Sequence, residues 1–222
     1  MSRTSDVRTR VIEAARRRFA ADGALSATLD EVRRDAKVSV GALYHHFPDK
    51  LALATAVYAQ VIGEYQAGLL EVLRGQDTAE GGIRGGVAYH LRWVSAHRGE
   101  ATLLLGARLE SDELRAANRA FFGAVADWWR PHHTYGVLQP MHIPITAALW
   151  LGPAQDYSRY WIASGETRMP RAVIETFADA AWAALRSNDI EEITDEQLHV
   201  PGDGRRGRRP GRAAAGTRRS SR

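Results

Sequence analysis

The chain has 222 residues, no cysteine and a formal net charge of +4 at pH 7. This length can bury a sizeable core in one or two domains, and the lack of cysteine excludes disulfides and thiolate metal sites. There is no run of about 18 apolar residues and no apolar N-terminal signal core, so we expect a cytoplasmic protein without membrane contact.

The charges are distributed unevenly along the chain. Residues 1–50 carry ten Lys/Arg and seven Asp/Glu, whereas residues 51–200 carry twelve Lys/Arg and eighteen Asp/Glu. Residues 201–222 add eight Arg and one Asp. A basic head and an acidic body are typical of a protein that presents one end to a polyanion. The Arg-rich tail either binds nucleic acid non-specifically or is a solubilising extension.

The N-terminal segment predicts a polar arm followed by a helix. Residues 1–9 are polar, and Arg3, Arg8 and Arg10 are candidates for contacts with a minor groove or with phosphates. The alternative is a disordered terminus without a binding role. Apolar residues at positions i, i+4 and i+8 then predict a first helix over residues 7–21.

The stretch TLDEVRRDAKVSVGALYHHFPDK, residues 28–50, predicts two short helices joined by a tight turn. Thr28 and Glu31 have the spacing of a capping box at the start of the first helix. Lys37–Val38 form the turn, and Ser39 caps the second helix. This pattern is typical of a helix-turn-helix.

The outer face of the second helix is suited to a close approach to DNA. Gly41 and Ala42 are small, and larger side chains there would hold the backbone away from a major groove. Tyr44, His45 and Lys50 place hydrogen-bond donors where phosphates would run beside that groove.

The first 60 or so residues resemble the N-terminal DNA-binding domain of the tetracycline-repressor (TetR) family of transcriptional regulators. The matching stretches are the opening helix VIEAARRRFAADGALSAT, the hairpin TLDEV…DAKVSVGALYHHF and the exit PDKLALATAVY. Two positions depart from the family pattern. Arg33 stands where the family usually has a small residue, and Lys37 stands where it usually has Gly, so Lys37 must adopt a backbone conformation that Gly adopts more readily.

The resemblance implies two sets of DNA contacts. Base edges would be read or approached by Ser39, Val40, Gly41, Ala42 and His45. Phosphates would be held by Thr28, Lys37, Tyr44 and Lys50.

The rest of the chain predicts further helices and no strand. Helical segments are expected at residues 51–73, 83–97, 100–109, 112–130, 143–163 and 170–186, with a loop from 75 to 86. The fold class is therefore all-α: a three-helix helix-turn-helix domain joined to a larger helical bundle for ligand binding and dimerisation. We expect a DNA-binding domain at 1–50, an effector-binding and dimerisation domain at 51–190, and a disordered acidic and then Arg-rich tail at 191–222.

Aromatic residues recur on the helical faces of the body. Most of them are expected in the core or at a subunit interface, but a bundle of this kind also suits an apolar pocket with a few polar anchors. The candidates for lining an effector pocket are Tyr65, Tyr89, Trp93, Phe122, Trp129 and Trp150.

The last two predicted helices carry more apolar surface than one small bundle requires. In the TetR family these helices form a four-helix dimer interface, which the resemblance implies here. Two-fold symmetry would set two recognition helices about 34–36 Å apart and demand a near-palindromic operator. The candidate interface residues are Leu149, Tyr157, Tyr160, Trp161, Phe177, Ala180, Ala181 and Ala184.

Catalytic and metal-binding patterns are weak. His132 and His133 are adjacent in an expected loop after Pro131, and His142 follows, but no helical i, i+4 His pair accompanies a carboxylate. No Gly-x-Ser-x-Gly elbow, Ser-Lys motif or P-loop is present. We expect no catalytic residue, no metal and no cofactor.

These observations predict a homodimeric transcriptional regulator, a repressor released from its operator by a small hydrophobic effector of unknown identity. Two alternatives stay open. One is a small-molecule-binding enzyme that carries a helix-turn-helix, and the other is a non-specific DNA binder that acts through the Arg-rich tail.

Overall fold

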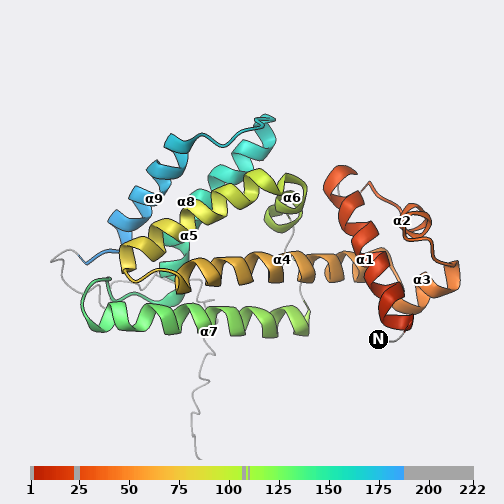
Figure 1. The fold of residues 1–222 in the computed structure, drawn as a ribbon, viewed down its shortest axis with the longest axis horizontal. Coiled ribbons are helices and arrows are strands. Elements are labelled where there is room, and N and C mark those ends of the chain that lie inside the picture. Colours follow the sequence, from red (N-terminus) through yellow and green to blue (C-terminus); the bar gives the residue numbers. More distant parts are fainter. Residues whose placement is uncertain (1–2, 23–25, 107–108, 110, 188–222) are drawn as a thin grey trace, which may run out of the picture. The chain divides into compact units, whose positions relative to one another are not determined.

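The computed structural model describes residues 3–22, 26–106, 109 and 111–187, so the expected tail lies outside the described residues. These ranges contain nine α-helices (Figure 1). Their bounds are α1 (Arg3–Asp22), α2 (Leu29–Ala36), α3 (Val40–His46), α4 (Lys50–Arg74), α5 (Ala79–Ala96), α6 (Arg98–Gly106), α7 (Asp112–Thr134), α8 (Ile143–Ser164) and α9 (Arg171–Leu185). Within the described ranges the one β-type contact is a single bridge between Leu138 and Arg186. The predicted all-α fold is confirmed.

Local signals explain how α2 and α3 begin and end. The Thr28 hydroxyl accepts the Glu31 N–H at 3.3 Å, and the Glu31 carboxylate accepts the Thr28 N–H at 2.8 Å, which completes the predicted capping box. Lys37 ends α2 in the left-handed conformation, with φ 53° and ψ 49°. The Ser39 hydroxyl then accepts the Ala42 N–H at 3.2 Å and starts α3.

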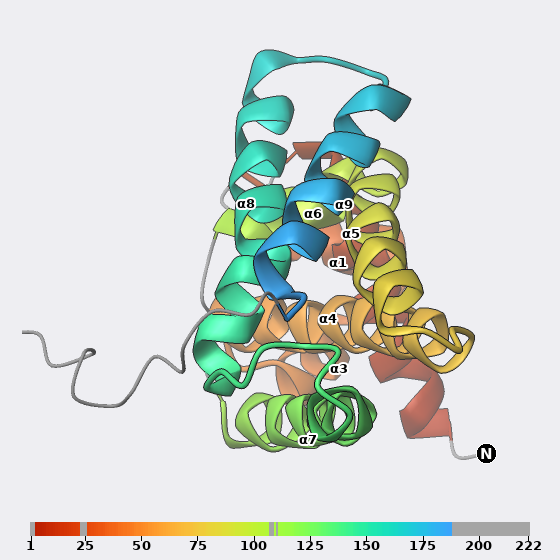
Figure 2. The ribbon, with the colours of Figure 1, turned by 90° about the vertical axis from the view of Figure 1, so that its left-hand side faces the viewer.

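Two hydrophobic cores lie along α4. The first joins α1, α2 and α3 to the beginning of α4 and includes Phe19, Leu43 and Val61. The second joins the rest of α4 to α5, α7, α8 and α9 and includes Leu69 and Trp129. Figures 1 and 2 show α5, α8 and α9 running beside one another, with α7 against α4. Helix α4 therefore connects the helix-turn-helix to the body.

The glycine-rich stretch at residues 75–86 differs from the expected loop, because α5 begins at residue 79. A Cβ at Gly82 would lie 2.2 Å from the Trp128 ring, and a Cβ at Gly86 would lie 2.3 Å from the Trp150 ring. Glycine costs about 1 kcal/mol in a helix, but here it lets two indole rings pack against the helix backbone, and burying such rings returns more than that cost.

The expected N-terminal arm is wrong from residue 3 onward, because α1 begins there. The Arg8 guanidinium lies 5.7 Å from the centre of the Phe47 ring, and Arg10 forms an i, i+4 ion pair with Asp6 at 3.5 Å. Both arginines therefore belong to a packed helix: Arg8 contacts the residue that ends α3, and the i, i+4 pair of Arg10 stabilises the helix itself.

Two further boundaries differ from expectation. Helix α7 continues through Pro131 to Thr134, so His132 and His133 lie in its last turn and not in a loop. Pro170 caps α9 and is not its first helical residue. Both changes extend or shift a helix by a turn or less, where propensity signals are least informative.

Candidate functional site

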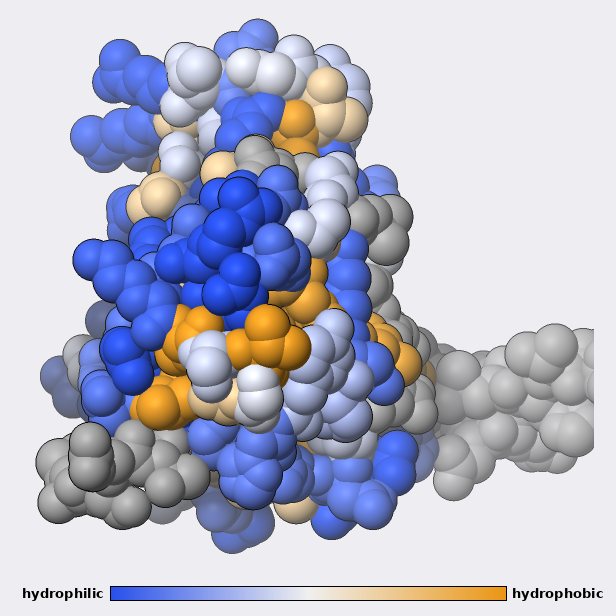
Figure 3. Space-filling view, turned by 90° about the vertical axis from the view of Figure 1, so that its right-hand side faces the viewer, coloured by the Kyte–Doolittle hydropathy of each residue, from blue (hydrophilic) through white to orange (hydrophobic). Residues whose placement is uncertain are grey.

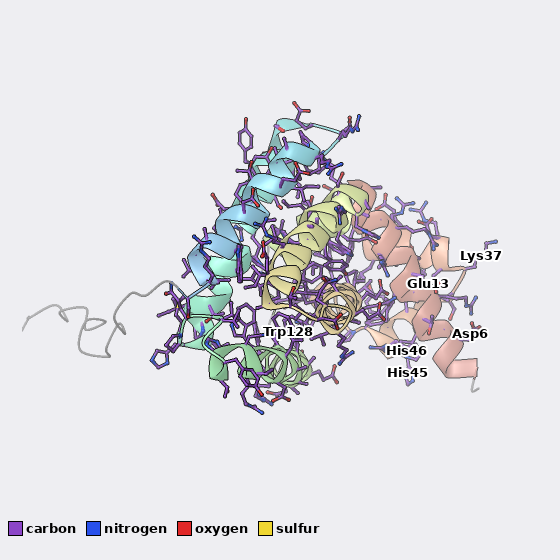
Figure 4. All side chains as sticks on the ribbon, turned by 60° about the vertical axis from the view of Figure 1, so that its left-hand side comes forward. Asp6, Glu13, Lys37, His45, His46 and Trp128 are labelled. Atoms are coloured by element: carbon purple, nitrogen blue, oxygen red, sulfur yellow. The ribbon has the colours of Figure 1, made fainter. Side chains whose placement is uncertain are left out.

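The outer face of α3 is open and carries small and polar groups. Val40 is 55% exposed and Tyr44 is 51% exposed, and Gly41 and His45 are exposed as well. A Cβ at Gly41 would meet no described atom within 4 Å apart from its chain neighbours and the backbone of its own helix. Figure 4 shows Lys37 and His45 pointing away from the helical body. This face can approach another molecule closely.

An apolar patch lies on the same end of the molecule. Figure 3 views this end and shows apolar side chains bordered by strongly hydrophilic ones. Val40 and Leu51 are exposed apolar residues of α3 and α4. Exposed apolar groups at a contact surface can meet the methyl groups of thymine in a major groove, while the polar border can meet phosphates.

Several predicted contact residues already have local partners. The Thr28 hydroxyl donates to Glu31 at 2.7 Å, so both donors of Thr28 are used in the capping box. Ser39 is exposed and holds the Ala42 N–H, while Ala42 and Lys50 are half-buried. A phosphate at Thr28 would therefore compete with Glu31 for the same donors.

The arginines around α2 are paired with acids. Arg33 and Arg34 approach the Asp30 carboxylate at 2.8 Å and 3.1 Å, and Arg18 approaches Asp35 at 2.6 Å. The hydrogen bond from Arg33 lowers the pKa of Asp30, and the one from Arg18 lowers the pKa of Asp35. The positive charge available to DNA is thus smaller than the number of arginines indicates.

A charged contact joins α1 to the body, and sequence reasoning did not find it. Arg16 lies 2.7 Å from Glu64 of α4 and 2.8 Å from Glu100 of α6. Beside it, a Cβ at Gly99 would lie 2.3 Å from the Ala20 carbonyl oxygen. Helix α6 therefore contacts the backbone of α1 directly.

A cavity of about 730 Å³ lies among α4, α5, α6, α7 and α8. Most of its lining is apolar or aromatic, which is typical of sites for small organic ligands. Five of the six predicted pocket residues line it: Tyr65, Trp93, Phe122, Trp129 and Trp150.

Tyr89 is the predicted pocket residue that lies outside this lining. Its hydroxyl donates to the backbone carbonyl of Tyr65 at 3.0 Å, and its ring fills the space beside Gly68. Tyr89 therefore holds α5 against α4 and does not face the cavity.

A buried hydrogen-bond chain crosses the wall of the cavity. The Tyr65 hydroxyl lies 2.9 Å from Nδ1 of His90, Nε2 of His90 lies 3.2 Å from Oγ of Ser158, and Ser158 donates to the Ala154 carbonyl at 2.7 Å. Because the Ser158 hydroxyl donates its only proton to that carbonyl, its oxygen must accept a hydrogen bond from Nε2–H of His90. Nδ1 of His90 therefore carries no proton and accepts from the Tyr65 hydroxyl. Burial lowers the pKa of His90 to about 4, so the ring is neutral at pH 7.

The sequence did contain a signal for His90. It lies in the apolar stripe of Ile83, Val87 and Val94, at helical spacing. A polar residue in such a stripe needs a buried partner, and Tyr65 and Ser158 provide it.

Residues 11–57 match a family of bacterial regulatory proteins, the tetR family, and this segment contains α2, α3 and parts of α1 and α4. The chain belongs to the TetR family. Over 54 residues it is 46% identical to SrpR, an HTH-type transcriptional regulator of Pseudomonas putida. That alignment covers 24% of this chain and 25% of SrpR.

Solved structures extend the likeness to the whole TetR-family fold. A TetR family transcription regulator from Marinobacter aquaeolei VT8 superimposes with a TM-score of 0.68 at 17% identity, covering 84% of this chain and 98% of that one. FadR from Bacillus subtilis, solved in complex with stearoyl-CoA, superimposes with a TM-score of 0.64 at 13% identity. This superposition covers 79% of this chain and 97% of FadR. At these identities the likeness is one of fold. The protein is a TetR-family transcriptional regulator with an N-terminal DNA-binding helix-turn-helix.

The predicted dimer residues of this TetR-family chain fall into three groups. Leu149, Tyr160 and Ala180 are exposed, Tyr157, Phe177 and Ala184 are half-buried, and Trp161 and Ala181 are buried. Arg98 lies over the Trp161 ring at 4.6 Å, so this indole belongs to the core of its own protomer. Only the first two groups have surface to offer a second copy.

No helix among the described residues combines the length and the apolar character needed to cross a membrane. No group of three or more His, Asp or Glu in that part of the chain is arranged to hold a metal ion.

Proposed function

We propose that this TetR-family regulator is a cytoplasmic homodimeric repressor that leaves its operator when an apolar small molecule fills the cavity. The observation that carries the proposal is that the same helices line the cavity and contact the helix-turn-helix domain. Helices α4 and α6 line the cavity, and the same two helices hold Arg16 of α1. A ligand that moves either helix would therefore move the helix-turn-helix.

The DNA contacts follow from the exposed face of α3. Gly41 and Ala42 let the helix approach base edges, Val40 can meet a thymine methyl group, and Ser39 and His45 supply polar contacts. Phosphates are assigned to Thr28, Lys37, Tyr44 and Lys50, which flank that face. In this assignment residues 1–50 read the operator and residues 51–190 bind the effector and the second copy.

Dimerisation is assigned to α8 and α9. Leu149 and Tyr160 on α8 and Ala180 on α9 supply exposed surface, and Tyr157 and Phe177 pack against each other beside it, with ring centres 5.1 Å apart. A two-fold axis through this surface gives two copies of α3, which requires a near-palindromic operator with half-sites about one helical turn apart.

Release by ligand is a shift between two conformations of the dimer. The ligand must bind more tightly to the conformation whose α3 helices no longer fit successive major grooves. The aromatic lining and the volume of about 730 Å³ support an apolar ligand. The similar fold of FadR from Bacillus subtilis, which holds stearoyl-CoA, supports a ligand with a long apolar chain.

The test is a selection of binding sites from random duplex DNA with the full-length chain. We expect an enriched inverted repeat. Tyr44→Ala should weaken binding to all sequences alike, because it removes a phosphate contact, whereas Ala42→Val should change the preferred bases. A monomer that binds all duplexes equally would refute the proposal.

A further inference from the structure

The charged residues that line the cavity have one sign. Arg115 and Arg159 are the charged side chains of the described lining, and no Asp or Glu of the described part contributes to it. Arg115 is bonded to Asp112 at 2.6 Å, which leaves Arg159 as the stronger candidate for a ligand contact. A cavity lined by arginine and by no carboxylate favours an anion over a cation, because a cation would lose its hydration without a counter-charge.

The cavity is long. Thr146 and Arg159 both line it and are thirteen positions apart on α8, which corresponds to about 20 Å along the helix. A ligand that contacts both residues must be elongated.

Arg159 lies at the rim of the cavity beside α6, and its side chain is 52% exposed. Its Nε donates to the Leu105 carbonyl at 3.2 Å, which fixes the guanidinium against α6. The Asp156 carboxylate is 3.8 Å from Nη1, longer than a hydrogen bond. The planar guanidinium therefore keeps donors that a carboxylate can use, and such charge-assisted bonds are among the strongest polar contacts.

Thr146 lies toward the other end. It is 4% exposed, it lines the cavity, and its hydroxyl has no hydrogen-bond partner among the described residues. Buried hydroxyls are nearly always bonded, so a ligand group can supply the missing partner once a rotation of the side chain turns the oxygen, which protein atoms cover, toward the cavity. Between the two ends, the side-chain amide of Gln66 donates a hydrogen bond to the Asn118 side-chain oxygen at 2.7 Å. These two amides therefore already have one hydrogen-bond partner each.

We infer that the cavity binds an elongated amphipathic acid. Its anionic group lies at Arg159, its apolar body lies along Trp93, Trp129 and Trp150, and a hydroxyl or carbonyl group near its far end reaches Thr146. This inference rests on the proposed role of the cavity as the effector site, and it adds the charge and the shape of the effector.

Binding can be measured without DNA, because three of the six tryptophans line the cavity. The full-length chain is titrated with hexadecanoic acid, hexadecanol, hexadecylamine and omega-hydroxyhexadecanoic acid, and tryptophan emission is followed. A rigid aromatic acid tests whether the apolar body is a chain or a ring system. The expected order of affinity is hydroxy acid, then acid, then alcohol, with the amine weakest.

Three variants separate the two polar anchors. Arg159→Gln should lower the affinity for the acid by roughly tenfold or more and leave the affinity for the alcohol unchanged. Arg159→Lys should keep most of the preference for the acid over the alcohol. Thr146→Val should remove the advantage of the hydroxy acid over the plain acid. Arg130→Gln is the matched control, because Arg130 pairs with Asp127 on α7 outside the lining.

Two results would overturn the inference. One is equal affinity for the acid and the amine, and the other is an equal loss of affinity for the acid and the alcohol in Arg159→Gln. The site selection on DNA separates this inference from the proposed function. An enriched inverted repeat together with no preference for acids removes only the inference. Binding of acids together with no enriched DNA site refutes the proposed function and leaves the inferred acid preference of the cavity supported.

Discussion

Gly99 offers the sharpest test of how α6 meets the helix-turn-helix. A Cβ there would lie 2.3 Å from the carbonyl oxygen of Ala20, 2.4 Å from its Cα and 2.6 Å from its carbonyl carbon. These are backbone atoms, so no side-chain rotation can relieve the clash. In Gly99→Ala, α6 must withdraw from α1 by about 1 Å, and overpacking of this kind costs about 1–3 kcal/mol.

Gly63→Ala is the matched control. Gly63 lies in the middle of α4, is exposed, and would place its Cβ at least 4 Å from any described atom outside its own helix. Because alanine forms helices better than glycine, this variant should gain about 0.5–1 kcal/mol. The two variants make the same chemical change and should move stability in opposite directions.

Urea denaturation followed by circular dichroism measures both free energies of unfolding. We expect the free energy of unfolding of Gly99→Ala to be about 1.5–4 kcal/mol lower than that of Gly63→Ala. Gly99→Ala should also weaken operator binding, because the Arg16–Glu100 contact lies beside the clash. If the two variants unfold at the same urea concentration with the same slope, α6 does not press on α1 as described, and the reasoning is refuted.

Three further predictions concern single residues. His90 binds a proton near pH 6.5 when unfolded but only near pH 4 when folded, so stability should fall by roughly 3 kcal/mol as the pH drops from about 6.5 to 4. Urea titrations across that range should show this slope in the natural chain and a flatter one in His90→Gln. Thr28→Ala should lose about 1 kcal/mol with the capping box, and Thr28→Ser should retain it in thermal melts. Lys37→Gly should gain about 0.5–1 kcal/mol, since glycine adopts φ 53° without strain; a loss would contradict the conformation of this turn.

The helix-turn-helix could be predicted from sequence because its signals are local. Thr28 with Glu31, and Ser39 with Ala42, act across three residues and appear in the structure as hydrogen bonds. The fold class also followed from periodicity alone, because amphipathic stretches of helical period fill nearly all of the described chain.

The remaining features depend on partners far along the chain. The glycines of α5 indicated a loop, and the reason they are helical is Trp128 and Trp150, more than forty residues away. Arg16 stands in a run of three arginines, and nothing local distinguishes the one that meets Glu64 and Glu100. Distant packing decides such cases against local propensity.

The Arg16 contact also limits how this regulator can be recombined with its relatives. In a hybrid regulator, the DNA-binding domain of a relative would be joined to the effector-binding body of this chain. A graft that lacks arginine at this position would leave Glu64 and Glu100 facing each other without a cation. Hybrids built on this body should therefore keep that arginine, whichever operator they are meant to read.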